Sequence, residues 1–141
     1  MRYSSSIYGE FEYNQGDVVN LTKSLPGFDC LKKFALVDLK EYEPFKMFQS
    51  LEDKYVGLIV ISPFDFYEEY EIDIADIVMR NLGIEDLKDM LILTTVTLNS
   101  DPKKVTTNLR APIIINNSNR FGEQIILDTA KYKIKHPLYE E

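Results

Sequence analysis

Short β-strand patterns separated by close-spaced turns run through most of this sequence. Apolar and polar residues alternate from Ile7 to Tyr13, the period of a strand with one face in water. Residues 14–17 have turn composition, and extended patterns resume after them. Further strands are expected at residues 18–21, 34–39, 45–50, 56–61, 91–98, 105–109, 113–116 and 124–128. Many short strands with close turns predict an antiparallel barrel or sandwich.

Helical patterns are few. The best lies at residues 75–82, where Asp76 falls in the first turn and Gly83 can end the helix. Ile74, Ile77, Val78 and Leu82 would share one face of it. Short turns of helix are expected at residues 85–89, and 29–33 has the length for one more. The patterns therefore predict a mainly β single domain over residues 1–141, an antiparallel barrel or sandwich with one or two short helices.

Composition and charge exclude several classes of function. The net charge is −7, and an acidic domain repels phosphate backbones, so direct nucleic-acid binding is not expected. The apolar runs are far shorter than a membrane span, and the first residues lack the apolar core of a signal peptide. Cys30 is the only cysteine, which excludes an internal disulfide and a cysteine-based metal cluster. We expect a cytoplasmic protein that does not contact membranes.

Residues suited to catalysis are scarce. His136 is the only histidine and lies beside Pro137 near the end of the chain, so an exposed structural role is expected. Cys30 follows a Pro-Gly turn among apolar residues, which favours a buried side chain over a nucleophile. The glycines form no Gly-x-Gly pair, so nucleotide-binding fingerprints are absent from the sequence. These patterns predict a protein that is not an enzyme and holds no cofactor.

An irregular polar stretch interrupts the apolar pattern at residues 107–113. Pro112 lacks a backbone donor and biases Ala111 toward an extended conformation, so this stretch is not an ordinary central strand. Asn108 and Arg110 then have two possible roles. In one, Asn108 ties the loop while Arg110 pairs with a carboxylate such as Glu52 or Asp53. In the other, both residues border a partner-binding site.

Six acidic residues fall within residues 65–76. If the segment is extended, Glu69, Glu71 and Asp73 line one face, opposite Tyr70, Ile72 and Ile74. The run fits a solvated edge strand protected by charge, or a docking surface for a basic protein. A Ca²⁺ or Mg²⁺ site is a third interpretation, although the EF-hand spacing is missing. The acids are Asp65, Glu68, Glu69, Glu71, Asp73 and Asp76.

Aromatic residues precede and interleave these acids. Phe64 and Tyr70 fit either a core or an interface. Phe66 and Tyr67 are adjacent, and adjacent residues in extended chain point in opposite directions. One member of this pair is therefore expected to face solvent.

Several stretches, taken in order, resemble the bacterial flagellar assembly factor FliW family. They begin with Leu-Pro-Gly-Phe at 25–28, Phe-Ala-Leu-Val at 34–37, Pro-Phe at 44–45, Phe-Gln-Ser-Leu-Glu-Asp at 48–53 and Ser-Pro-Phe at 62–64. They continue with Tyr-Glu-Ile-Asp-Ile at 70–74, Thr-Asn-Leu-Arg-Ala-Pro-Ile at 107–113, Gln-Ile-Ile-Leu at 124–127 and Tyr132. Glu68 and Glu69 depart from the family, in which a pair closer to Pro-Asp precedes the tyrosine.

The resemblance implies a small β-barrel-like fold and a regulator that acts by binding proteins. Proteins of this kind bind CsrA, an RNA-binding translational repressor, and prevent it from holding flagellin messenger RNA. They also bind flagellin, which competes with CsrA. Under this hypothesis the partner-binding residues are Glu69, Glu71, Asp73, Asp76, Phe66, Tyr67, Asn108 and Arg110. The alternative is a β-barrel that binds a small molecule or a divalent metal.

Overall fold

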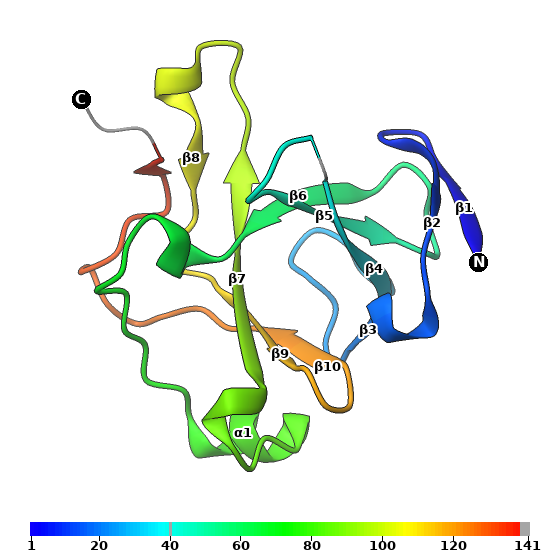
Figure 1. The fold of residues 1–141 in the computed structure, drawn as a ribbon. Helices are drawn as coiled ribbons and strands as arrows, with labels where there is room; N and C mark the ends of the chain where they lie inside the picture. The colour runs from blue at the N-terminus through cyan, green and yellow to red at the C-terminus, as the bar shows by residue number, and fades with distance from the viewer. Residues whose placement is uncertain (40, 139–141) are drawn as a thin grey trace.

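The protein is described by a computed structural model that covers residues 1–39 and 41–138. Among these residues, seven strands close into a barrel in the order β7-β6-β5-β4-β3-β10-β9, with β9 pairing back onto β7 (Figure 1). The strands are β3 Val18–Leu21, β4 Lys33–Asp38, β5 Lys46–Ser50, β6 Gly57–Ile61, β7 Met90–Thr97, β9 Ile113–Asn116 and β10 Phe121–Gln124. The predicted β-barrel class is confirmed.

One pairing in the barrel is parallel. Phe121 and Gly122 of β10 lie beside Asn20 and Leu21 of β3, and the two strands run in the same direction. The other barrel pairings are antiparallel. The parallel pair closes the barrel between segments that are about a hundred residues apart in sequence, and Thr22 N–H extends it by donating to Gly122 O.

The strand alternation divides the apolar residues between two clusters. The barrel interior holds side chains such as Phe34 and Phe48, which stack with ring centroids 4.5 Å apart. On β7 and β9, Ile92 and Ile114 are register partners whose side chains belong to a second cluster outside the barrel. Because successive residues of a strand face opposite sides, a strand buried on both faces reads as a continuous apolar run, as β9 does.

The second cluster is covered by α1 Asp76–Leu82, by residues 66–74 and by residues 125–138, which we call the C-terminal segment. Gly83 ends α1 in the left-handed conformation with φ 68°, as the sequence predicts. Val78 and Leu82 are buried, whereas Ile77 is exposed, so its predicted place on the buried face is wrong. The predicted turn at 85–89 is observed as the 3₁₀ turn η3 Leu87–Asp89. Further 3₁₀ turns are η1 Gln15–Asp17, η2 Pro63–Asp65 and η4 Pro102–Lys104.

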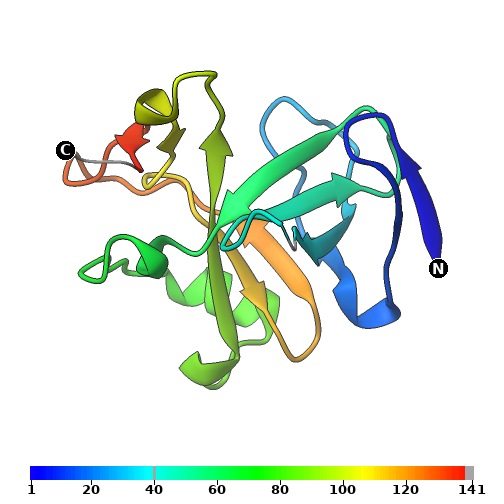
Figure 2. The ribbon, with the colours of Figure 1, turned by 45° about the horizontal axis from the view of Figure 1, so that its top comes forward.

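Short elements flank the barrel on two sides. The hairpin of β1 Arg2–Ser5 and β2 Gly9–Glu12 lies on one side, and β8 Thr106–Thr107 with β11 His136–Pro137 lies on the other (Figures 1 and 2). Figure 1 shows α1 near the lower end of β7. No described helix is long and apolar enough to cross a membrane.

Several sequence-based boundaries are wrong. The alternating pattern from Ile7 begins as a strand only at Gly9, and its partner β1 was not predicted. The strand expected at 124–128 lies at Phe121–Gln124, and the one expected at 105–109 is only β8. No helix forms at residues 29–33, because Asp29 and Cys30 form a turn and Lys33 already belongs to β4. Cys30 is exposed rather than buried, since it occupies this turn with φ 69°.

Candidate functional site

The stretch at residues 108–112 is a large bulge in the strand that faces β7. Thr107 lies opposite Val96 and Ile113 lies opposite Leu93, so six steps along one chain face three steps along the other. The extra residues leave the ladder, and Pro112 is accommodated because no ladder donor is needed there. This confirms that the stretch is not an ordinary strand.

Asn108 and Arg110 hold the bulge in shape. The Asn108 N–H donates to Thr95 O at 3.0 Å, and the Asn108 side-chain oxygen accepts from the Arg110 N–H at 3.0 Å. Arg110 Nε donates to Tyr132 O at 2.9 Å. The structural role proposed for Asn108 therefore has a direct geometric basis, although these contacts leave a partner-binding role untested.

The expected pairing of Arg110 with Glu52 or Asp53 is wrong. Glu52 instead accepts hydrogen bonds from the backbone N–H groups of Lys32 and Lys33, at 2.7 and 2.9 Å. These bonds lower the pKa of the Glu52 carboxyl. Asp53 Oδ1 accepts from the Tyr55 N–H at 2.9 Å. Both carboxylates shape the turn between β5 and β6.

The C-terminal segment runs along the bulge as an irregular additional strand. Ile125 N–H donates to Pro112 O at 3.0 Å, and Leu127 N–H donates to Arg110 O at 2.8 Å. Further along, Leu109 N–H donates to Lys133 O at 3.1 Å. The side chain of Leu109 is buried in the outer cluster. Three backbone hydrogen bonds therefore join the bulge to residues 125–133.

Hydrogen bonds of two tyrosines join residues 65–76, the acidic segment, to the bulge and to the C-terminal segment. Tyr70 Oη donates to Leu109 O at 2.6 Å. Tyr132 Oη accepts from the Glu71 N–H and donates to Glu71 O, both at 2.8 Å. The two rings lie 4.7 Å apart, and burial raises the pKa of the Tyr70 phenol. The backbone N–H and C=O of Glu71 are thus both bound by one hydroxyl.

The six acids are all exposed, and we call them the acidic face: Asp65, Glu68, Glu69, Glu71, Asp73 and Asp76. Tyr70, Ile72 and Ile74 point inward to the outer cluster, so the predicted alternation is observed. The segment from Glu69 to Ile74 nevertheless joins no ladder in the described part of the chain. The edge-strand interpretation is therefore wrong, and the carboxylates are presented by hydrogen bonds from tyrosines instead.

An open pocket of about 380 Å³ separates the acidic segment from the C-terminal segment. Glu71, Asp73 and Asp128 contribute carboxylates to its lining, and Lys131 contributes one ammonium group. Its apolar lining consists of Ile72, Leu127 and Tyr132. Such a pocket suits a basic side chain with an apolar stem.

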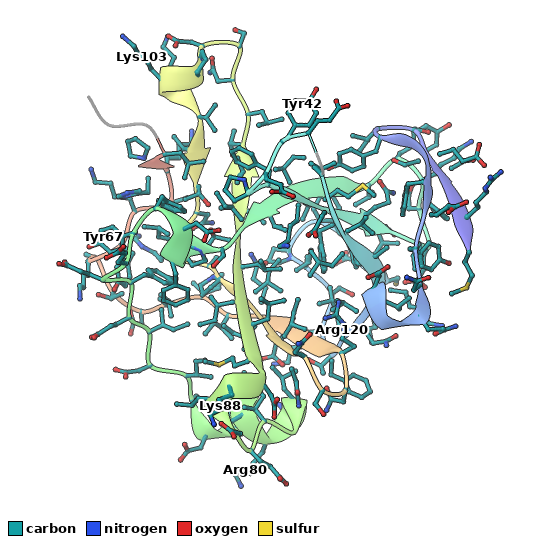
Figure 3. The ribbon with its side chains drawn as sticks, viewed as in Figure 1. Tyr42, Tyr67, Arg80, Lys88, Lys103 and Arg120 are labelled. Atoms are coloured by element: carbon teal, nitrogen blue, oxygen red, sulfur yellow. The ribbon has the colours of Figure 1, made fainter. Side chains whose placement is uncertain are left out.

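Phe66 and Tyr67 lie beside the C-terminal segment. Their ring centroids are 6.0 and 5.6 Å from that of His136, and both side chains are half-buried. The sequence predicts that one of the pair faces solvent, and the structure leaves both partly exposed, because His136 contacts each ring and Tyr132 contacts Tyr67. Figure 3 shows Tyr67 at the side of the molecule where η2 and the C-terminal segment meet. Of the other aromatics, Tyr70 is core and Phe64 is exposed.

The metal interpretation of the acidic run finds no ligand set in residues 1–39 and 41–138, where no group of three or more suitable side chains converges. Gln49 belongs to the Phe-Gln-Ser-Leu-Glu-Asp stretch by which the sequence resembles the family. It is fully buried and accepts from Ser5 Oγ at 2.7 Å, so it joins the N-terminal hairpin to β5.

Sequence reasoning missed the part played by Tyr132. The tyrosine was noted only as a point of family resemblance, and no local pattern connects it with Glu71, which is 61 residues away. The available signal in the sequence is an aromatic residue between the lysines at 131, 133 and 135. In the structure these lysines are exposed and Tyr132 is buried.

Comparisons with known proteins agree with this architecture. The family model described as FliW protein matches residues 2–138. A protein of Clostridium beijerinckii named flagellar assembly factor FliW is 54% identical over all of both chains. One of the same name from Clostridium botulinum strain Alaska E43 is 56% identical, also over all of both chains.

A solved structure has the same fold. It is a crystal structure of the flagellar assembly factor FliW, which superposes with a TM-score of 0.91 at 33% identity. The match covers 100% of this chain and 99% of that one. Taken with the barrel, the bulge and the family match, this similarity places the chain in the FliW family of flagellar assembly factors.

Proposed function

We propose that this protein regulates flagellin synthesis in the cytoplasm by partner switching. It binds the translational repressor CsrA and stops it from holding flagellin messenger RNA. Flagellin competes for the protein, so accumulating flagellin releases CsrA and lowers flagellin translation. In this role the protein performs no chemistry, holds no cofactor and makes no direct contact with nucleic acid or membrane.

Family membership over residues 2–138 is the observation that carries the proposal. The acidic face adds a physical reason. A protein that grips RNA neutralises phosphates with lysine and arginine, and an acidic partner attracts such a surface at long range. The tyrosine bonds to Glu71 hold part of this face in one conformation, which reduces the entropy lost on binding.

Within the acidic face, Glu69, Glu71, Asp73 and Asp76 are assigned to the CsrA contact. Glu71 and Asp73 border the pocket beside Lys131 and are placed to receive a basic side chain. Phe66 and Tyr67 adjoin the same surface through His136, and half-buried aromatics can supply anchors within a charged rim. Asn108 and Arg110 contribute indirectly by holding the bulge that supports Tyr132.

The test is a calorimetric titration of the purified protein with CsrA and, separately, with flagellin at physiological salt. Saturable binding of both, with flagellin displacing CsrA, is the expected result. A third titration places flagellin messenger RNA with CsrA and adds this protein, which is expected to release the RNA. Absence of binding to CsrA would overturn the proposed function, whatever flagellin does.

A further inference from the structure

A second surface of the molecule differs in chemistry from the acidic face. Two hollows, of about 360 and 280 Å³, lie over β6 and β7 and share Leu58 and Val96 in their linings. The β6–β7 ladder ends at Ile59 and Val96, and residues of both strands at and beyond this point line the two hollows. We call the two hollows together the uncharged groove.

None of the described residues that line the uncharged groove carries a formal charge at neutral pH. In a chain with 28% charged residues and a net charge of −7, this is a local departure from the average surface. Polar lining is limited to neutral groups such as Asn108, Gln124 and Thr95. A charged segment entering this groove would lose hydration without meeting a counter-charge.

Apolar side chains at the groove are left in water. Leu98, Ile126 and Ile7 are 63%, 69% and 51% exposed. Covering them and the half-buried Leu58 and Val96 would remove apolar surface from water at about 25 cal/mol per Å². The occupant that fits is an uncharged apolar segment of another protein.

We propose that the uncharged groove is the docking site for an apolar segment of flagellin, a surface separate from the one that meets CsrA. This assignment rests on the proposed function, which supplies two protein partners. The acidic face is complementary to the basic repressor, and the uncharged groove offers that partner no counter-charge. The second partner therefore takes the second surface.

The bulge lies between the two surfaces and contacts both. Asn108 and Ala111 line the uncharged groove, whereas Leu109 accepts from Tyr70 and Arg110 donates to Tyr132. The C-terminal segment is divided in the same way, with Ile126 in the groove and Leu127 in the acidic pocket. A segment bound in the groove can thus displace the bulge and, through Arg110 and Tyr132, the backbone at Glu71. Competition between the two partners is then indirect.

The experiment uses exposed residues with matched controls. Ile126→Glu and Leu98→Glu each place a charge in the groove. Ile77→Glu and Leu87→Glu place the same charge on residues of the same type that are 56% and 67% exposed elsewhere. All four positions are exposed, so folding is expected to survive, and the melting temperature checks this. Each variant is titrated with flagellin and with CsrA.

Both groove variants are expected to bind flagellin about tenfold or more weakly, while the two controls stay within about twofold of wild type. CsrA affinity is expected to stay within about twofold in all four, and flagellin no longer displaces CsrA from the groove variants. Wild-type flagellin affinity in both groove variants would overturn the inference and leave the proposed function standing. Absence of flagellin binding by the wild-type protein would overturn both.

Light scattering of the wild-type protein separates flagellin from a second copy of this chain as the occupant. A monomer is expected. A dimer that Leu98→Glu and Ile126→Glu dissociate would assign the groove to self-association and contradict the inference.

Discussion

The hydroxyl of Tyr132 binds both backbone polar groups of Glu71, accepting from its N–H and donating to its carbonyl at 2.8 Å each. A backbone partner in a ladder would satisfy Glu71 in the same way. The acidic segment is therefore held like a strand without joining a sheet, and its carboxylates face outward. The side chain that does this comes from the C-terminal segment, which the bulge holds in turn.

Tyr132→Phe removes the hydroxyl and leaves the ring in place. Loss of the two bonds is expected to lower the free energy of unfolding by about 1–3 kcal/mol, because the Glu71 N–H and C=O lose their partner. Hydrogen exchange at the Glu71 amide is expected to speed up more than exchange in β7. Tyr42→Phe, at a tyrosine that is 65% exposed, is the control and should leave both quantities unchanged. Equal protection of Glu71 in both proteins would contradict this role.

Arg110→Ala tests the link between the bulge and the C-terminal segment. Its bond to Tyr132 O is lost, and we expect a decrease of about 1–2 kcal/mol in unfolding free energy by denaturant titration. Arg80→Ala, at an exposed arginine of α1, is expected to change stability by less than about 0.5 kcal/mol. If the two substitutions cost the same, the bond to Tyr132 contributes nothing beyond an average surface arginine.

Gly57→Ala tests the packing of the N-terminal hairpin against β5 and β6. An added Cβ would lie 2.6 Å from Gln49 Oε1 and 2.8 Å from a ring carbon of Tyr8. Because Gln49 also holds Ser5, we expect the hairpin to shift and stability to fall by about 1–3 kcal/mol. Gly16→Ala meets nothing within 4 Å and should be neutral or slightly stabilising. Thermal melts of both variants make the comparison, and a neutral Gly57→Ala would show that the hairpin adjusts freely.

Glu52 gives the protein a dependence on acid pH. Its two backbone hydrogen bonds lower its pKa below the ordinary 4.5, so its contribution to stability is fully present above that pH. The contribution is lost as the pH falls through the folded-state value. The stability difference between wild type and Glu52→Gln is therefore expected to shrink below pH 4.5. Urea titrations across this range measure it, with Glu85→Gln, which replaces another exposed glutamate, as the control.

The sequence predicted the parts of the fold that depend on local patterns. Extended apolar stretches between turns predicted most barrel strands to within a residue or two, and Gly83 predicted the end of α1. β10 was misplaced because its buried residues include Gly122 and Glu123, which lack an apolar signature. A Cβ on Gly122 would lie 3.2 Å from Ile114 O, so the close approach of strands selects glycine there.

The sequence predicted those features of the candidate site that depend on neighbouring residues, but not its long-range contacts. The exposed alternation of Glu71 and Asp73 follows from period two, and Pro112 marked the bulge. The supports of the site come from elsewhere in the chain. Arg110 finds the Tyr132 carbonyl rather than a carboxylate, and Tyr132 finds Glu71, and no spacing in the sequence encodes either contact. Long-range hydrogen bonds of this kind depend on the closed barrel.

The proposed binding of CsrA by the acidic face depends on the charge of Glu71 and Asp73. Calorimetric titration of CsrA into wild type and into the double variant Glu71→Lys with Asp73→Lys tests it most directly. The control reverses Glu85 and Asp89, two exposed acids beyond α1, and so makes the same change in net charge. We expect the affinity of the first variant to fall by about tenfold or more, with unchanged melting temperature, and the control to stay within about threefold. Equal affinities in the two variants would contradict the account.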